Sequence, residues 1–295
     1  MKNQRKAMAY GLVTVLLWST VASAFKLSLR YLEPAHLLLY SGSFSTLLLA
    51  VILACQGKFG RVFRCSRGEY GMSLLLGLLN PFLYYQVLFK AYDLLPAQQA
   101  QPLNYTWAIT LSLLAIPLLG QKFKWKEFAA LLLSYCGVVV ISTEGDLLGL
   151  HFSNPLGVAL ALASTVIWAL YWIFNTRDRR DPVVALLANF LFGLPFVFGY
   201  CLLFTDLSWP PLPGLLGAVY VGTFEMGACF VFWLLAMKYA ESTARVSNLI
   251  FLSPFLSLVL IHFLVGEEIL SSTLVGLVLI VAGLIVQQWP GRKGG

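Results

Sequence analysis

The sequence predicts an all-α integral membrane protein, built from ten transmembrane helices arranged as two inverted five-helix repeats. Three observations support this prediction: the composition, the number of long apolar runs and the placement of the basic residues. Of the 295 residues, 59% are hydrophobic and only 11% are charged, and the mean hydropathy is +0.80. A soluble domain carries about 25% charged residues. The chain therefore has too little polar surface to coat a core in water, and a lipid bilayer must be its outer solvent.

Ten apolar runs follow one another along the chain. They cover residues 7–29, 35–55, 69–91, 97–119, 126–143, 154–175, 182–204, 213–237, 243–264 and 270–289. About 20 apolar residues are enough to cross the hydrocarbon core as a helix, and each run must be helical because unpaired backbone groups are too costly in lipid. The first run is too long for the apolar core of a signal peptide, so we expect it to remain as the first span.

The basic residues favour one orientation of these spans. If the N-terminus is cytoplasmic, 17 of the 20 Lys and Arg residues fall on the cytoplasmic side. Only Lys26, Arg30 and Lys90 lie toward the outside, and we expect Lys26 to reach the outer surface by snorkelling. Cytoplasmic loops carry an excess of Lys and Arg, so the bias predicts a multi-pass protein of the cell (inner) membrane with both termini cytoplasmic. It also explains the net charge of +7 without a nucleic-acid partner.

The second half of the chain repeats landmarks of the first. Offsets of 150 and 146 residues align Ala9 with Ala159, Leu12 with Leu162, Trp18 with Trp168, Gly120 with Gly266 and Gly137 with Gly283. Two units of five runs result, residues 7–143 and residues 154–289, with a hydrophilic linker between them. Because five is odd, the second unit enters the membrane from the opposite side, as in the inverted repeats of many secondary transporters.

Small residues occur seven positions apart late in each unit. They are Ala130 and Gly137 in the first unit and Gly276 and Gly283 in the second. Small residues let helix backbones approach closely in a membrane. We therefore expect one close-packing helix face in each half.

Several short motifs, taken together, resemble those of a known family. They are Trp18-Ser19-Thr20, Ala240-Glu241-Ser242-Thr243-Ala244, Ser253-Pro254 and Gly266-Glu267. With the five-plus-five arrangement, they resemble the drug/metabolite transporter superfamily, in its EamA family. The resemblance covers residues 8–288 and implies a membrane transporter of small metabolites.

One branch of that family looks closest. Asn104, Tyr105 and Trp107, with Gly120-Gln121-Lys122, are similar to the bacterial aromatic amino-acid exporters. Ala108 stands where those exporters tend to have a proline. The resemblance therefore implies the fold and the transport role, and it leaves the substrate open.

One acid, Glu225, lies near the middle of the eighth run. A charged side chain at the bilayer centre costs about 2.5–3.5 kcal/mol on insertion scales, so such residues usually have a function. We expect Glu225 to face a cavity between the repeats, where it could exchange a proton with the substrate or pair with an amine. The alternative is a structural acid bonded to a neighbouring helix. An offset of 145 places Asn80 at equivalent depth in the first half, which favours a site on the pseudo-twofold axis.

Other polar and aromatic residues are candidates for the substrate-binding cavity. They are Trp18, Thr20, Tyr84, Gln101, Asn104, Tyr105, Trp168 and Tyr171. The polar residues of the fourth run recur at helical spacing and form one stripe, and aromatic faces stack on planar or cationic ligands. The alternatives are that the glutamines lie at the outer interface and that the aromatic residues only pack or form an interfacial belt.

The pattern as a whole favours a secondary transporter over an enzyme. No nucleotide-binding loop, HExxH or GxSxG motif occurs in the sequence. The scattered histidines and five cysteines have no metal-site spacing, and we expect no metal or cofactor. We expect export of amino acids or related compounds by alternating access around a midplane cavity. The alternative is a membrane-embedded scaffold or an enzyme without transport activity. The sequence leaves the coupling ion and the oligomeric state open.

Overall fold

The computed structural model describes residues 2–120, 125–149, 152, 154–206, 209–241, 246 and 248–288. Within this part of the chain the regular structure is helical, with no strand. Each of the ten predicted apolar runs contains helix. Seven helices are long and apolar enough to cross a bilayer, and three shorter apolar helices cover Phe128–Ser142, Leu249–Val265 and Ser271–Gln287.

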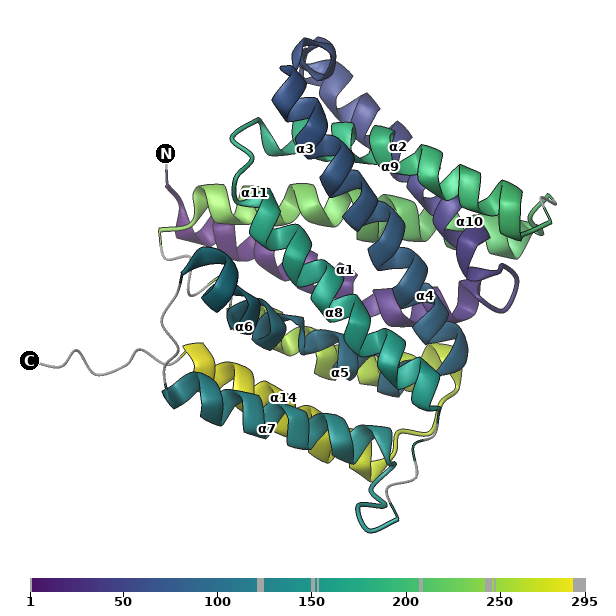
Figure 1. Ribbon diagram of the computed structural model, residues 1–295, viewed down its shortest axis with the longest axis vertical. Coiled ribbons are helices and arrows are strands. Elements are labelled where there is room, and N and C mark those ends of the chain that lie inside the picture. The colour runs from purple at the N-terminus through teal and green to yellow at the C-terminus, as the bar shows by residue number, and fades with distance from the viewer. Residues whose placement is uncertain are drawn as a thin grey trace, which may run out of the picture.

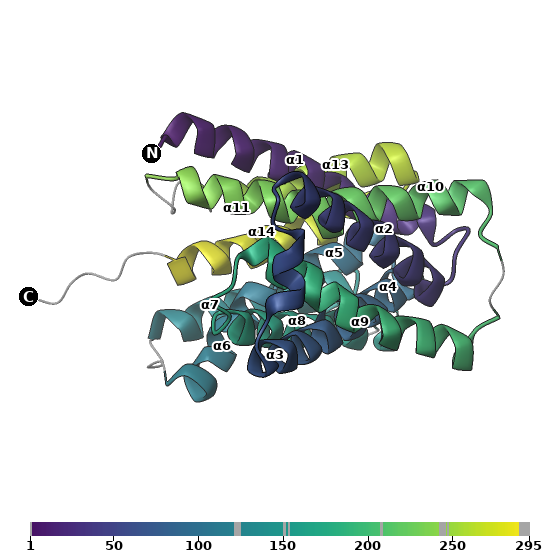
Figure 2. The same ribbon diagram turned by 90° about the horizontal axis from the view of Figure 1, so that it is seen from above.

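The helices form one bundle (Figures 1 and 2). The first half contains α1 (Gln4–Ser28), α2 (Pro34–Cys55), η1 (Phe59–Arg64), α3 (Arg67–Gly77), η2 (Leu78–Leu83), α4 (Tyr84–Leu94), α5 (Ala97–Tyr105), α6 (Trp107–Leu119) and α7 (Trp125–Ser142). The second half contains α8 (Pro155–Asn175), α9 (Pro182–Phe204), α10 (Leu212–Tyr220), η3 (Val221–Ala228), α11 (Cys229–Tyr239), η4 (Asn248–Leu252), α13 (Ser253–Leu260), η5 (Ile261–Val265) and α14 (Ser271–Gln288).

Polar residues and prolines start two helices of the second half. The side chain of Asn154 accepts a hydrogen bond from the backbone N–H of Gly157, and that of Asp181 accepts one from Val183. A proline follows each cap at the first helical position, where its missing N–H costs nothing. Asn154 and Asp181 therefore act as helix N-caps.

The predicted small-residue faces pack against each other. Helices α7 and α14 lie side by side at one edge of the bundle (Figure 1). A Cβ atom on Gly137 would lie 2.5 Å from the backbone oxygen of Gly276, and one on Gly283 would lie 2.8 Å from that of Ala130. The prediction of a close-packing face in each half is confirmed, and the face of one half packs on that of the other.

Two of the predicted spans change helix type near their middles. Arg67–Leu94 and Leu212–Tyr239 each run for 28 residues, and each changes to π-helix near its middle, at η2 and at η3. Asn80 in η2 has φ −146° and ψ 117°, outside the helical range, and Pro81 has no N–H to donate. Asn80 and Glu225 thus lie in the irregular segments of two equally long spans. Irregular segments within membrane helices often occur at functional sites.

The two ends of the bundle differ in charge. We call one end the basic end, because Lys58, Arg61, Arg64, Arg177, Arg179 and Arg180 lie in its loops and in the short helix η1. We call the other the acidic end, because Glu33, Asp93, Glu144, Asp146, Glu267 and Glu268 lie in its loops and at the end of α4. Helix α1 begins, and α14 ends, at the basic end (Figure 1).

Candidate functional site

The two halves of the chain enclose a cavity of about 150 Å³ in the middle of the bundle. We call it the central cavity. Its walls are formed by Trp18, Val21, Ala22, Phe25, Tyr84, Leu88, Tyr92, Gln101, Asn104, Tyr105, Trp107, Trp168, Trp172, Glu225, Phe230, Trp233 and Ile250. These residues come from α1, α4, α5, α6, α8, η3, α11 and η4. Ten of the 17 are aromatic, which makes ring faces the main surface that a ligand would meet.

Glu225 projects into this cavity from the π-helical segment η3. Its Oε1 atom accepts a hydrogen bond from the hydroxyl of Tyr85, 3.1 Å away. The indole of Trp18 borders the same carboxyl group. The second oxygen, Oε2, is buried and has no hydrogen-bond partner among the described residues. Tyr85 therefore fixes one oxygen of the carboxyl group, and the other oxygen has no hydrogen-bond partner among the described residues.

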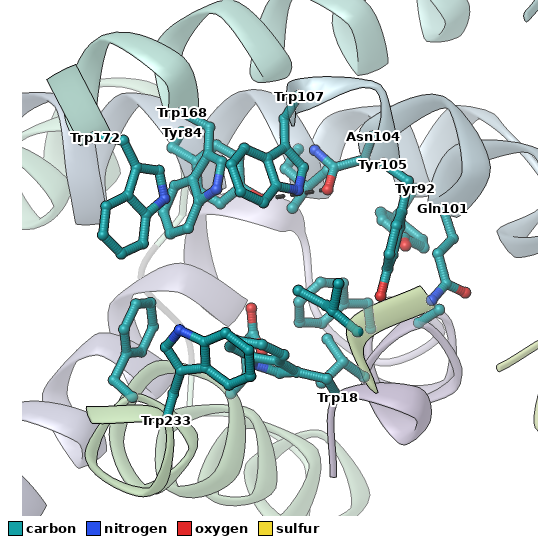
Figure 3. A pocket seen from close by; sticks show the side chains of 17 residues that line it. Trp18, Tyr84, Tyr92, Gln101, Asn104, Tyr105, Trp107, Trp168, Trp172 and Trp233 are labelled. Carbon is teal, nitrogen blue, oxygen red and sulfur yellow. Dashed lines mark hydrogen bonds between the residues drawn. The ribbon is translucent and has the colours of Figure 1, made fainter. Parts of the chain in front are cut away.

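Tryptophans form two facing walls. In Figure 3, Trp172, Trp168 and Trp107 line one wall, and Trp233 and Trp18 line the opposite wall. The Trp18 and Trp233 ring centroids are 5.5 Å apart. On the other wall, Tyr84 stacks on Trp168 with 4.4 Å between centroids. Neighbouring rings on each wall therefore pack against one another.

The amide groups at the cavity differ in their remaining hydrogen-bonding capacity. Asn104 donates to the hydroxyl of Ser164 at 2.9 Å and accepts from the hydroxyl of Tyr84 at 3.4 Å. Its amide is therefore held by α4 and α8. In contrast, Oε1 of Gln101 is buried without a partner in the described part of the chain. Tyr105 lies beside Ser253 of α13 and closes one side of the cavity (Figure 3).

Seven of the ten residues that the sequence singles out lie on the wall of the central cavity. They are Trp18, Tyr84, Gln101, Asn104, Tyr105, Trp168 and Glu225. Thr20, Asn80 and Tyr171 do not line it. Thr20 lies on the other side of α1, where its hydroxyl is 2.6 Å from that of Tyr220.

Asn80 and Tyr171 form a separate polar cluster behind the wall. Asn80 of η2 and Asn189 of α9 are both buried, and the hydroxyl of Tyr171 lies beside both amides. Neither amide completes a hydrogen bond within the described residues. Asn80 and Glu225, which the sequence offset pairs, therefore lie at similar positions along their two spans. Only Glu225 lies on the cavity wall.

Several important residues of the cavity are not among those that the sequence singles out. Trp107, Trp233, Phe230 and Tyr92 line the cavity, and Tyr85 stands directly behind Glu225. Trp233 follows Glu225 by eight residues, so helical periodicity offered a signal for it. Tyr85 offered none, because its role depends on how α4 packs against η3.

A second, smaller cavity of about 100 Å³ leads from the central cavity toward the basic end. The two share Trp172, Phe230 and Trp233 in their walls. Asp178 and Arg180 border the smaller cavity and form an ion pair with 2.6 Å between Oδ2 and Nη2, with both side chains about 95% buried (6% and 5% exposed). Burial raises the pKa of Asp178, but the hydrogen bonds and charge of Arg180 outweigh it and hold that pKa below its usual range.

At the acidic end, two charged side chains form hydrogen bonds to helix ends. The carboxylate of Glu267 accepts hydrogen bonds from the backbone N–H groups of Ala97 and Gln98, at 2.8 and 3.0 Å. The ammonium group of Lys26 donates to the backbone oxygens of Tyr92 and Leu95, at 2.8 and 2.7 Å. Both charges lie where the helix dipole favours them, since the N-terminus of α5 attracts an acid and the C-terminus of α4 attracts a base.

Comparisons with known proteins agree with this architecture. The model of the EamA-like transporter family matches residues 5–143 and 155–287. The chain is 26% identical over 269 residues to a protein of Ancylobacter novellus named aromatic amino acid exporter YddG, covering 88% of each chain. It is 26% identical over 297 residues to a protein of Salmonella typhimurium named "Probable amino-acid metabolite efflux pump", covering 96% of this chain and 94% of that one. A solved crystal structure with 23% identity superposes with a TM-score of 0.69 over 97% of both chains, which shows a shared fold.

Proposed function

The chain belongs to the EamA-like transporter family, and we propose that it exports amino acids or related small organic metabolites by alternating access around the central cavity. Family membership makes the protein a multi-pass membrane transporter rather than an enzyme. The observation that carries the proposal is the central cavity, where one acid, two amides and ten rings from both halves of the chain surround a space inside an apolar bundle. The names of its relatives support the substrate class.

The proposed architecture is two five-helix repeats of opposite orientation, residues 7–143 and 154–289. The matched spans Arg67–Leu94 and Leu212–Tyr239 support it, because they have equal length and an offset of 145 residues. Each has a π-helical segment near its middle. The three shorter apolar helices complete ten membrane crossings. The excess of basic residues at the basic end supports an orientation in which that end and both termini lie on the cytoplasmic side of the cell (inner) membrane.

Alternating access requires a path that opens to one side at a time. The smaller cavity beside Asp178 and Arg180 provides the start of a path to the basic end. At the acidic end, Glu267 of the second half binds the N-terminus of α5, and Lys26 of α1 binds the C-terminal end of α4 within the first half. In this proposal the substrate enters from the cytoplasm and leaves when the contacts of Glu267 and Lys26 separate.

Transport is tested with the purified full-length protein in liposomes. Vesicles preloaded with unlabelled amino acids should accumulate the labelled compounds by counterflow. An imposed pH gradient should drive net accumulation, and Glu225→Gln should abolish that dependence if the acid carries the proton. An unchanged pH response in Glu225→Gln would remove the acid from coupling while leaving the carrier intact. Absence of counterflow for every amino acid and every related amine tested would contradict the proposed substrate class.

Labelling of single cysteines distinguishes a carrier from a scaffold. A cysteine at Gln101, on the cavity wall, should react with a small thiol reagent and be protected by substrate. A cysteine at Asn80, behind the wall, should react slowly in both conditions. A scaffold predicts slow reaction at both positions, with no effect of substrate.

A further inference from the structure

The charge of the central cavity is set by one acid. Among the described residues that line it, Glu225 is the only one that can carry a charge at neutral pH, since none is Lys, Arg, Asp or His. Arg180 borders the neighbouring cavity, but its guanidinium is already paired with Asp178 and donates to the hydroxyl of Ser73 at 2.8 Å. Lys26 is engaged with backbone oxygens at the acidic end. A ligand in the cavity therefore meets a carboxyl group and no opposing base.

Three hydrogen-bonding atoms of the wall are fully buried and have no partner among the described residues, and two of them are acceptors. Oε2 of Glu225 and Oε1 of Gln101 are both buried without a partner in the described residues, and Nε1 of Trp172 is the one such donor on the wall. A buried polar atom that is left unpaired costs about 1–3 kcal/mol. A ligand that brings N–H groups would satisfy the two acceptors, whereas a ligand carboxylate would leave them unpaired.

The ring faces also favour positive charge. A cation over a tryptophan face is attracted by the ring quadrupole, and aromatic cages recognise quaternary ammonium groups in this way. Here Trp18 and Trp233 face Trp168 and Trp172 across the cavity (Figure 3). Glu225 borders Trp18, so the acid and the ring faces act on the same ligand group.

A zwitterionic amino acid fits this wall poorly. Its carboxylate would be desolvated beside Glu225, with two like charges in a medium of low dielectric constant. A buried charge requires a partner, and the donors that the described wall offers are neutral indole, amide and hydroxyl groups. The cavity of about 150 Å³ is comparable to one that holds a benzene molecule, which suits a compound with a single ring.

From these observations we propose that the central cavity selects organic monocations, namely arylalkylamines whose carboxylate is absent or masked. In the bound state Oε2 of Glu225 faces the ammonium group and the tryptophan faces enclose the ring. This inference rests on the proposed transport function and narrows its substrate class from amino acids to their decarboxylated or esterified relatives.

Four compounds that share a phenyl ring and a two-carbon chain test the inference. They are phenethylamine, trimethyl(phenethyl)ammonium, phenylalanine and 3-phenylpropionate. Thermal stabilisation of the purified full-length protein measures binding, because a ligand of the folded state raises apparent stability. Both amines, phenethylamine and its quaternary analogue, should bind at least tenfold more tightly than phenylalanine, because both carry the positive charge that Glu225 and the ring faces attract. Only phenethylamine also supplies N–H groups to the free acceptors. 3-Phenylpropionate should give no shift. In Glu225→Gln the affinity for both amines should fall at least tenfold, while Glu268→Gln, an exposed acid outside the cavity, should behave as wild type.

The result that overturns the inference is equally specific. It fails if phenylalanine or 3-phenylpropionate binds as tightly as the amines, if neither amine binds, or if Glu225→Gln leaves amine affinity unchanged. Counterflow measurements distinguish failure of this inference from failure of the transport proposal. If amino acids exchange across the liposome membrane and amines do not, the transport function stands and the inference fails. If amines bind with this selectivity but no compound exchanges, the inference stands as a binding site and the transport function fails.

Discussion

The hydroxyl of Tyr85 donates a hydrogen bond to Oε1 of Glu225, with 3.1 Å between the two oxygen atoms. Tyr85 is fully buried at the start of α4, whereas Glu225 lies in η3. The contact therefore joins the two halves of the chain at the wall of the central cavity. It also fixes the direction in which the other carboxyl oxygen points.

The first prediction concerns this contact. Tyr85→Phe removes only the hydroxyl and leaves a buried acceptor unpaired, which costs about 1–3 kcal/mol. We expect the half-saturating substrate concentration in counterflow to rise about tenfold, since 1.4 kcal/mol corresponds to that factor. Tyr70→Phe is the control, because it also removes a hydroxyl, which donates to the backbone oxygen of Val62 near the basic end. Equal effects of the two substitutions on counterflow would contradict a role for Tyr85 through Glu225.

The second prediction concerns the seam between α7 and α14. A Cβ atom on Gly137 would meet the backbone oxygen of Gly276 at 2.5 Å, so Gly137→Ala must push the helices apart. Overpacking of this kind costs about 1–3 kcal/mol. Gly199→Ala is the matched control in α9, because nothing lies within 4 Å of its added Cβ and alanine gains about 0.5–1 kcal/mol over glycine in a helix. In thermal unfolding in detergent, the unfolding temperature should fall for Gly137→Ala and rise for Gly199→Ala.

The structure also shows why sequence reasoning placed some candidates and misplaced others. Trp18 and Thr20 are two residues apart on a helix, so they cannot share a face, and only Trp18 reaches the cavity. Asn80 and Tyr84 are four apart and would share a face in a regular helix. The non-helical backbone at Asn80 breaks that register, which leaves Tyr84 on the cavity wall and Asn80 behind it.

Features that depend only on composition or on residue spacing could be predicted from the sequence. The apolar runs and the seven-residue spacing of Gly276 and Gly283 follow from lipid exposure and helix geometry alone. The exposure of Glu225 to a cavity could be expected from its insertion cost. Its bond to Tyr85 joins residues 140 positions apart, and no local pattern encodes such a contact.

The third prediction concerns pH. Arg180 holds the pKa of Asp178 below its ordinary value of 3.8, so the ion pair stabilises the fold fully above pH 3.8 and loses this contribution as the pH falls through the lower folded-state value. Removing one partner of a buried pair costs about 3–5 kcal/mol. Asp178→Asn should therefore lower the unfolding temperature near neutral pH. It should also show a smaller further drop in unfolding temperature than the wild type as the pH falls. Asp93→Asn, which breaks an exposed pair with Lys90, should cost at most about 1 kcal/mol. Equal losses of stability in the two variants would show that burial of the Asp178–Arg180 pair is unimportant.

The last prediction concerns the closed acidic end. The two carboxylate oxygens of Glu267 accept from the backbone N–H groups of Ala97 and Gln98. Glu267→Gln keeps one acceptor oxygen, replaces the other by a donor and removes the charge that favours the N-terminus of α5. We expect this end to open more often. A cysteine at Leu88, on the cavity wall, should then react several-fold faster with an impermeant maleimide added from the acidic side, in a background without the five native cysteines.

Glu268→Gln is the control for this measurement, because the Glu268 side chain is exposed and only its backbone oxygen contacts Gln98. Loss of a hydrogen bond to a charged group amounts to about 1.5–3 kcal/mol, which would raise the open population by about tenfold or more. Reagent added from the basic side should react no faster with the Glu267 variant, since the two ends open in alternation. Faster labelling from both sides would indicate general loosening of the bundle, and unchanged labelling from the acidic side would show that Glu267 does not hold that end closed.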